Sequence, residues 1–301
     1  METTPKTKKY SKSQRPPKGS LPSVALSERD KDTLGFLQWL GMADASQLAG
    51  LLRVYGHKPE DHPNFKSGEG WRVRLGRNFR NLWWHSLINR SSVRDRKYKL
   101  RADEIYLSPS QKDVSGIHML HRLERNEFLI SLLLAVSENS HIDVQRIEVD
   151  EDISFTVSFY DPVRKQKVQK KVTPDVLLVL TKPDVSKVQL VYVEIDRSTE
   201  SQERLRAEKI LAYRQWFRNG GVTERYGYKG FRVLFVATES EARKENIRAT
   251  IKKSDPVQAS RLFMVAHKTY SLEDPSPILE RVWQCAEDYA TDTQQWHDLL
   301  G

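Results

Sequence analysis

The sequence predicts an α/β protein with a helical N-terminal part and a C-terminal part in which helices alternate with the strands of a mixed sheet. Two observations predict this class. Apolar residues recur at helical spacing between residues 27 and 87. After residue 115, short β-branched runs alternate with amphipathic stretches of helical length, which is typical of a sheet covered by helices.

Composition narrows the class of partner. The chain has 301 residues, a formal net charge of +9, and 30% charged residues. This balance favours a polyanion, nucleic acid before a membrane surface, and the alternative is a basic surface that serves solubility alone. The single cysteine, Cys285, excludes a disulfide framework and a cysteine-rich zinc site. No apolar stretch has the roughly 20 residues of a membrane helix, so we expect a cytoplasmic protein.

Residues 1–26 are predicted to form a disordered basic tail. Six lysines and arginines stand there against one acid, Glu2, and Pro16, Pro17 and Gly19 oppose a helix. Such a tail either contacts phosphates without sequence preference or is an inert extension.

Two helices are predicted to follow. The first begins after Ser27, a good N-cap with Asp30 as its partner, and ends at Gly41. The second begins after Asp44 or Ser46. The apolar residues expected to face inward are Leu34, Leu37, Trp39 and Leu40 in the first helix and Leu48, Leu51 and Leu52 in the second.

A third helix is predicted over residues 71–87, and a basic hairpin over residues 94–107 with a turn at Ala102-Asp103. Three helices followed by a basic hairpin is the order of a winged helix-turn-helix domain, expected at residues 27–108. There the third helix enters the major groove of DNA and the hairpin contacts the backbone. The alternative is an arginine face used for protein contacts. The candidate DNA-binding residues are Arg72, Arg74, Arg77 and Arg80 on the helix and Arg94, Arg96, Lys97 and Lys99 in the hairpin.

The C-terminal part, residues 115–301, is predicted to contain a long helix from about Ser115 and then a series of strands and helices. A half-buried strand at residues 153–159 is followed by a basic stretch with Arg164, Lys165, Lys167, Lys170 and Lys171. The remaining elements are expected as strands at 176–180 and 188–195, a helix at 200–217, a strand at 231–237, a helix at 239–252, a strand at 262–266 and a helix at 278–286.

Three carboxylates stand where two of these strands begin or end. Asp175 precedes the strand at 176–180, and Glu194 and Asp196 end the strand at 188–195. Residues two apart in a strand point to the same face, so Glu194 and Asp196 are expected side by side. Like charges that close raise each other's pKa unless a cation or a proton lies between them. Together with Lys209 on the next helix, the pattern favours metal-dependent phosphodiester chemistry.

These residues resemble two known families. Pro174-Asp175, Glu194-Ile195-Asp196 and the helix with Lys209 resemble the PD-(D/E)xK nuclease-like core, which has the order αβββαβ. Over nearly the whole chain after residue 26, the sequence resembles the replication-relaxation family of bacterial plasmids and integrative elements. The matching features are the winged helix, His121-x-Leu123 with Asn126-Glu127, Pro174-Asp175, the run from Glu194 to Glu200, and Lys209 followed by Tyr213.

The nuclease resemblance implies roles for single residues. Asp175 and Glu194 would bind Mg²⁺, with Mn²⁺ as a substitute, and Lys209 would hold or deprotonate the attacking water. Asp196 departs from the pattern because it occupies the position of the usual lysine, a role that Lys209 would take over. Glu127 is expected as a third ligand or a water-orienting group, Asp196 as a ligand of a second metal, and Arg197 as a phosphate contact. In the alternative, the acids form an ion-pair cluster with Arg197, Lys209 and Arg214.

The sequence therefore predicts a bacterial cytoplasmic protein that binds double-stranded DNA of a plasmid or mobile element. It would act in replication, relaxation or mobilisation, as a metal-dependent endonuclease or nickase. One alternative is an inactive accessory factor that binds an origin and recruits a relaxase or a replication protein. Another is a transcriptional regulator whose α/β domain forms a homodimer. No membrane partner is expected.

Overall fold

The computed structural model describes residues 26–57, 82, 89–95, 100–110, 116–139, 141–161, 163–254, 262–280, 283–285 and 296–297. The chain divides into two compact units, Met1–Met119 and Leu120–Gly301. No helix within these described residues is long and apolar enough to cross a membrane.

The first two helices of unit 1 begin as the sequence predicts. α1 (Glu28–Leu40) follows Ser27, whose side chain accepts a hydrogen bond from the backbone N–H of Asp30 while the Asp30 carboxylate accepts from the N–H of Ser27. The helix ends at Gly41, which has φ 77°. Of the two expected caps of α2 (Ala45–Val54), Asp44 is the one used.

A three-stranded antiparallel sheet completes the described part of unit 1. Its strands, in the order β1-β3-β2, are β1 (Met42–Asp44), β3 (Leu100–Leu107) and β2 (Asn89–Asp95). β1 was not predicted, because three residues are too few to show an alternating pattern. The predicted turn at Ala102-Asp103 is wrong: both residues lie inside β3, and Ala102 pairs with Val93.

Most of the predicted DNA-binding residues lie outside the described residues. These are the expected third helix with Arg72, Arg74, Arg77 and Arg80, and the hairpin residues Arg96, Lys97 and Lys99. The tail at residues 1–25 lies outside them too. Arg94 belongs to β2, where its backbone pairs with that of Arg101.

Unit 2 is built on a seven-stranded mixed sheet in the order β12-β11-β10-β9-β8-β7-β4. β7 is antiparallel to both of its neighbours, β4 and β8, whereas β8, β9 and β10 are parallel to one another. The strands are β4 (Asp143–Val149), β7 (Val176–Lys182), β8 (Lys187–Asp196), β9 (Phe231–Ala237), β10 (Phe263–His267), β11 (Trp283–Cys285) and β12 (Trp296–His297). The mixed α/β sheet expected from the sequence is confirmed.

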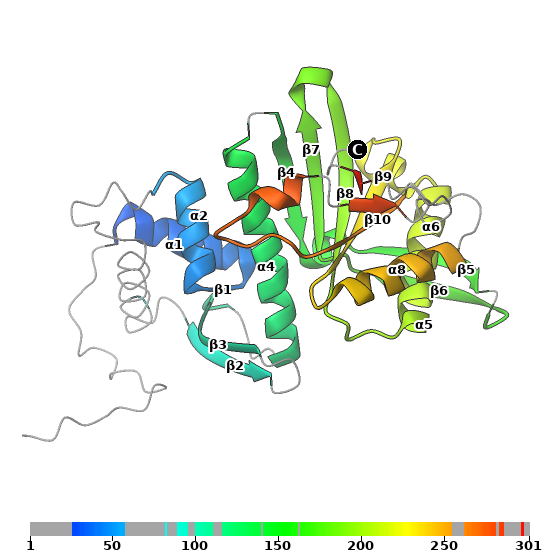
Figure 1. The fold of residues 1–301 in the computed structure, drawn as a ribbon, viewed down its shortest axis with the longest axis horizontal. Coiled ribbons are helices and arrows are strands. Elements are labelled where there is room, and N and C mark those ends of the chain that lie inside the picture. Colours follow the sequence, from blue (N-terminus) through cyan, green and yellow to red (C-terminus); the bar gives the residue numbers. More distant parts are fainter. Residues whose placement is uncertain are drawn as a thin grey trace, which may run out of the picture. The chain divides into compact units, whose positions relative to one another are not determined.

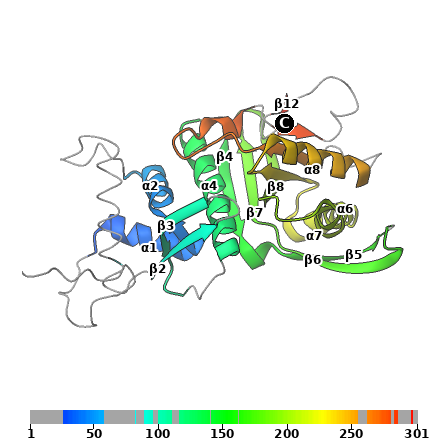
Figure 2. The same cartoon turned by 60° about the horizontal axis from the view of Figure 1, so that its bottom comes forward.

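Helices lie on both sides of this sheet. α4 (Gly116–Ser137), predicted to begin near Ser115, is on one side, and α6 (Leu211–Arg218) and α8 (Glu241–Ser254) are on the other (Figures 1 and 2). The predicted helix at 200–217 is divided into α5 (Gln202–Leu205), the π-helical η4 (Arg206–Ile210) and α6. The remaining short helices are η2 (Asp150–Ile153), η3 (Pro183–Val185), α7 (Gly221–Tyr226) and η5 (Ser276–Leu279).

A second, two-stranded sheet is formed by β5 (Phe155–Asp161) and β6 (Gln166–Val172). β5 is the predicted half-buried strand, and its residues alternate between buried and exposed as expected. It does not join the main sheet, however, where the unpredicted β4 takes the place next to β7. β4 carries Asp143, Arg146 and Glu148, so its sequence lacks the apolar run of a central strand, as is common at a sheet edge.

The predicted last helix at 278–286 is wrong. Residues Ser276–Leu279 form the short helix η5, and Trp283–Cys285 form β11, which pairs with β10. Cys285 is therefore buried in a strand rather than placed on a helix. The misassignment follows from a short apolar run, in which periodicity does not separate a helix from a buried strand.

An aromatic group joins β5 to the face of the main sheet that α6 covers. The Phe155 ring stacks on Trp216 with centroids 4.7 Å apart and lies 5.3 Å from Tyr213 and 5.9 Å from Tyr192. Phe155 is 4% exposed and belongs to the main hydrophobic core. These contacts hold the two-stranded sheet against α6.

Replacing Phe155 with alanine should therefore destabilise unit 2. Removal of a buried aromatic ring leaves a cavity and costs about 3–5 kcal/mol. Urea unfolding would measure the loss. Tyr160→Ala is the matched control, because Tyr160 lies on the same strand and is 62% exposed. Equal losses for the two variants would contradict the packing of Phe155.

Candidate functional site

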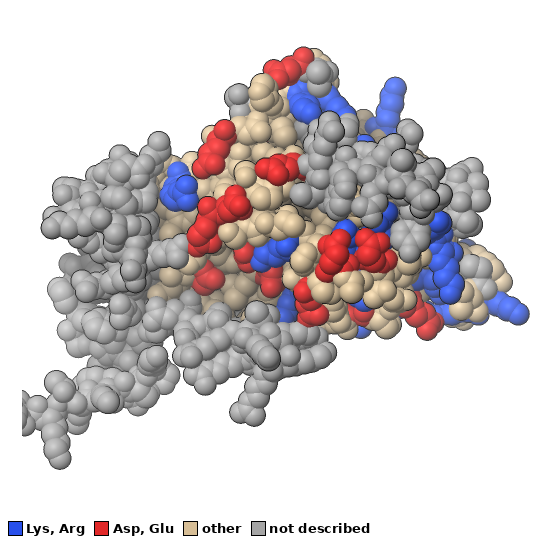
Figure 3. Space-filling view, in the orientation of Figure 1, with Lys and Arg blue, Asp and Glu red and all other residues tan. Residues whose placement is uncertain are grey.

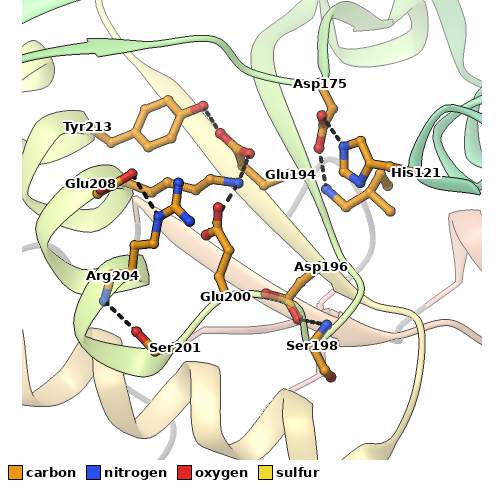
Figure 4. A network of polar contacts seen from close by, with 12 residues as sticks. His121, Asp175, Glu194, Asp196, Ser198, Glu200, Ser201, Arg204, Glu208 and Tyr213 are labelled. Carbon is orange, nitrogen blue, oxygen red and sulfur yellow. Dashed lines mark hydrogen bonds and ion pairs between the residues drawn. The ribbon is translucent and has the colours of Figure 1, made fainter. Parts of the chain in front are cut away.

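The predicted acids meet at one end of β7 and β8. Val176 pairs with Val193 in this antiparallel ladder, and the backbone N–H of Asp175 donates to the carbonyl of Val193 at 3.1 Å. Asp175 therefore lies just outside the ladder, beside its last pair, and close enough to Glu194 for its charge to raise the pKa of that carboxyl group. Figure 4 shows the two carboxylates in one network of polar contacts.

Asp175 is held by α4 and by its neighbouring strand. Its Oδ1 lies 2.7 Å from Nε2 of His121, and its Oδ2 accepts the backbone N–H of Ile195 at 2.7 Å. Burial alone would raise the pKa of Asp175, but the charge and hydrogen bond of His121 bring it below its ordinary value. In return, Asp175 raises the pKa of His121 against the effect of burial. Each partner of this pair therefore favours the charged form of the other.

Glu194 is 1% exposed and has two protein partners. Its Oε2 accepts from Nζ of Lys209 at 2.7 Å, and its Oε1 accepts from the hydroxyl of Tyr213 at 2.5 Å. Burial raises the pKa of Glu194 to about 7, with a contribution from Asp175 and against the opposing effect of Lys209. The ammonium group of Lys209 thus favours the charged form of Glu194, whereas the carboxylate of Asp175 opposes it.

Lys209 is placed by the π-helical segment η4. Its ammonium group contacts Glu194 and lies 3.8 Å from Oε2 of Glu200. Burial would lower the pKa of Lys209, but Glu194, Asp175 and Glu200 raise it above the ordinary value. Lys209 is therefore a cation at neutral pH. Single π-helical turns within α-helices are frequent at functional sites.

Asp196 has a different cationic partner. Arg243 of α8 donates from Nε to Oδ1 at 2.7 Å and from Nη2 to Oδ2 at 2.8 Å. The backbone N–H of Ser198 also donates to Oδ1 at 2.9 Å. Such a bidentate pair fixes the geometry of the carboxylate. Asp196 thus joins the end of β8 to α8, while Glu194 joins it to η4.

Three other residues that were named from the sequence have separate surroundings. Glu127 of α4 lies 2.7 Å from the ammonium of Lys268, which also contacts Glu124 at 3.3 Å. Arg197 is 3% exposed, so its side chain is buried rather than presented at the surface. Arg214, expected as an ion-pair partner of the acids, donates from Nη1 to the carbonyl of Ser254 at 2.6 Å.

Three contributors were not among the predicted site residues. Tyr213 and His121 appeared only as parts of the family resemblance, and Arg243 did not appear at all. Arg243 lies 47 positions after Asp196 in the sequence, and the separation of His121 from Asp175 is 54. No local pattern identifies such partners, because tertiary packing alone brings them together.

The acids at this end of the sheet offer oxygen ligands of the kind that Mg²⁺ takes. Within the described residues, no three or more His, Cys, Asp or Glu side chains form a group that could hold a metal ion. Asp175 and Glu194 nevertheless supply two adjacent carboxylates, and Mg²⁺ takes one or two carboxylates and keeps several waters. Each carboxylate oxygen has two lone pairs, so an oxygen that accepts one hydrogen bond retains a site for a cation. A hydrated divalent ion would therefore take these two carboxylates as ligands alongside the four hydrogen bonds in which they already take part.

The acids of this cluster lie among several cations. The carboxylates of Glu194, Asp175 and Glu200 act together on the ammonium group of Lys209 and raise its pKa against the effect of burial. Glu200 is also among the charges that raise the pKa of Arg204 and that of Arg243. Burial raises the pKa of Glu194 to about 7, so a proton relieves part of the negative charge near neutral pH.

The segment η4 also anchors the β5–β6 hairpin. Arg206 donates to both oxygens of Asp161 at 3.2 and 3.3 Å, and Lys170 lies 3.1 Å from Glu208. Asp161 is 1% exposed. Although burial raises the pKa of Asp161, Arg206 and the backbone N–H groups of Val163 and Arg164 lower it below its ordinary value. One helical segment thus carries the site lysine and fixes the hairpin.

Replacing Lys209 with methionine should strongly destabilise unit 2. The change leaves buried carboxylates without their cation, a cost of about 3–5 kcal/mol. Arg204→Met is the control, because Arg204 is 61% exposed and its pairing with Glu208 is worth less than about 1 kcal/mol. Adding Glu194→Gln to Lys209→Met should recover part of the loss in chemical unfolding. Two additive single effects would contradict the buried pair.

Replacing Asp161 with asparagine should give a pH-dependent loss of stability. The folded-state pKa of Asp161 is lowered, so its charge stabilises the fold above the unfolded pKa of about 4 and ceases to do so as the pH falls through the folded value. We expect a deficit of about 2 kcal/mol at neutral pH that narrows below about pH 4. Urea unfolding across this range would measure it. Asp184→Asn, at a residue that is 61% exposed, should show no such trend.

Sequence comparisons give a family for part of the chain. No curated protein and no solved structure matches it. A family model described as Replication-relaxation matches residues 89–233. The matched range includes β2, β3, the β5–β6 hairpin and Asp175, Glu194 and Lys209. It includes neither residues 27–88 nor residues 234–301, over which the resemblance was also expected. Over that range, which is just under half of the chain, the sequence is similar to the replication-relaxation family.

Proposed function

We propose that the protein binds double-stranded DNA of a plasmid or other mobile element and nicks it in a metal-dependent reaction during replication or relaxation. The family match suggests the biological setting. The observation that carries the chemistry is the contact of 2.7 Å between Lys209 and Glu194, with Asp175 immediately before the first residue of β7 that pairs with β8. Two carboxylates and a lysine thereby meet at the end of two central strands.

The topology of unit 2 supports a PD-(D/E)xK-like core. Its elements follow the order α4, β4, β7, β8, the helix from α5 to α6, and β9, which is αβββαβ with the β5–β6 hairpin inserted after β4. Asp175 stands before the second strand of this core and Glu194 near the end of the third, as the resemblance implies. In unit 1, the order α1, β1, α2, β2, β3 and the sheet order β1-β3-β2 support a winged helix.

The residues would divide the chemistry as follows. Asp175 and Glu194 would hold Mg²⁺, which would supply charge neutralisation at the phosphate and a more acidic bound water. Lys209 is held as a cation, so it would stabilise negative charge on the phosphate or orient the water rather than deprotonate it. His121 and Tyr213 would position the two carboxylates. Asp196 would position the end of β8, because Arg243 occupies both of its oxygens.

Assay of supercoiled plasmid with Mg²⁺ or Mn²⁺ tests this proposal. We expect nicking by the natural protein and a loss of about 100-fold or more in Asp175→Asn and Glu194→Gln. Glu203→Gln is the matched control, since Glu203 is exposed on α5. Thermal unfolding would show that each variant is folded. If the natural protein, with either ion, does not nick plasmid, the nuclease proposal is wrong.

A second candidate is an accessory factor that binds DNA without cutting it. The observation in its favour is that each oxygen of Asp175 and Glu194 has a protein hydrogen-bonding partner, so the cluster is satisfied as an ion-pair network. Such a protein would mark an origin and recruit a relaxase or a replication protein, alone or as a homodimer. DNA binding in a band-shift assay without nicking would favour this candidate.

A further inference from the structure

The β5–β6 hairpin has one face in the core and one face in solvent. Phe155, Val157 and Phe159 point inward and are buried, whereas the residues between them are exposed. Register pairs Thr156 with Lys171, Ser158 with Gln169, and Tyr160 with Lys167. These six residues form the outward face, and we call them the hairpin face.

The hairpin face is basic and carries no carboxylate. Its charged members are Lys167 and Lys171, and the turn beyond it adds the exposed Arg164 and Lys165. The one carboxylate of the two strands, Asp161, points inward and is paired with Arg206. In Figure 3, basic side chains gather toward the end of unit 2 that carries this hairpin, and a group of acidic side chains lies over α8.

The spacing of these groups suits a phosphate backbone. Lys167 and Lys171 are four residues apart on one strand, so they are separated by about 13 Å. That length spans about four base-pair steps of a duplex, which carries one phosphate per 3.4 Å on each strand. Hydroxyl groups, amide groups and tyrosines also donate to phosphate oxygens, and the hairpin face supplies them at Thr156, Ser158, Gln169 and Tyr160.

We propose that the hairpin face binds the sugar-phosphate backbone of double-stranded DNA. This inference rests on the proposed function and adds a second contact surface, in unit 2, to the one expected in unit 1. The hairpin is tied through Asp161 and Lys170 to η4, the segment that carries Lys209. The surface that would hold a duplex is thereby fixed to the segment that carries the lysine of the acidic cluster.

The test measures the affinity of the full chain for a short fluorescent duplex over a range of salt concentrations. Lys167→Gln/Lys171→Gln should lower the slope of log K against log salt by about 1 per lysine and weaken binding roughly tenfold or more at about 0.1 M salt. Lys167→Arg/Lys171→Arg should keep both the slope and the affinity. Lys229→Gln/Lys253→Gln is the matched control, because it removes the same charge at exposed positions outside the hairpin.

The outcomes separate this inference from the proposed function. If the natural protein binds no DNA, the proposed function fails and the inference fails with it. If the natural protein binds DNA, the comparison is between Lys167→Gln/Lys171→Gln and the control Lys229→Gln/Lys253→Gln. Equal salt slopes and equal affinities for these two variants would overturn the hairpin inference alone. Tighter binding of single-stranded RNA than of the duplex, lost on Lys167→Gln/Lys171→Gln, would also overturn it in favour of an RNA surface. Equal melting temperatures would show that the variants are folded.

Discussion

The buried ion pair between Glu194 and Lys209 is the contact on which the arrangement of unit 2 depends. One partner lies near the end of a central strand and the other on the π-helical segment η4, so the pair fixes the distance between sheet and helix. Breaking a buried pair leaves an uncompensated charge, which is far more costly than losing a surface contact. The same segment holds the hairpin through Arg206 and Glu208. The position of the hairpin therefore follows from the position of the site.

The same residues, Glu194 and Lys209, therefore suit both an ion-pair cluster that stabilises the fold and a nuclease-like site. A nuclease needs two carboxylates and a lysine close together, and a stable fold needs each of them paired. Here Lys209 meets both requirements at once, because it neutralises Glu194 while remaining a cation beside Asp175. The action of two neighbouring carboxylates, those of Glu194 and Asp175, on the single ammonium group of Lys209 distinguishes the cluster from a one-to-one ion pair. A balanced pair, such as Asp196 with Arg243, offers a metal ion no electrostatic advantage.

Sequence reasoning succeeded where a local pattern carries the information. β7, β8 and β9 are continuous apolar runs, and Ser27 and Gly41 bound α1 through local hydrogen bonds and a positive φ. The proximity of Asp175 and Glu194 followed from the meeting of two neighbouring strands. The sequence-based prediction missed β4 and β6, because their many charged residues do not form the apolar run typical of a buried strand. It also missed β11, which is too short to show a period. His121 and Arg243 required the tertiary fold, because nothing near them in sequence identifies their partners.

The distribution of charge connects the acidic cluster to the basic chain around it. A phosphate approaching buried carboxylates is repelled unless nearby cations offset their field, and such cations also raise the rate of encounter. The hairpin face that we propose as a DNA contact carries cations and no acid because the one carboxylate of its strands, Asp161, is turned inward. Asp161 shapes the turn by accepting the backbone N–H groups of Val163 and Arg164, and its charge is neutralised by Arg206. The buried pair that anchors the hairpin thus also leaves its exposed face without a negative charge.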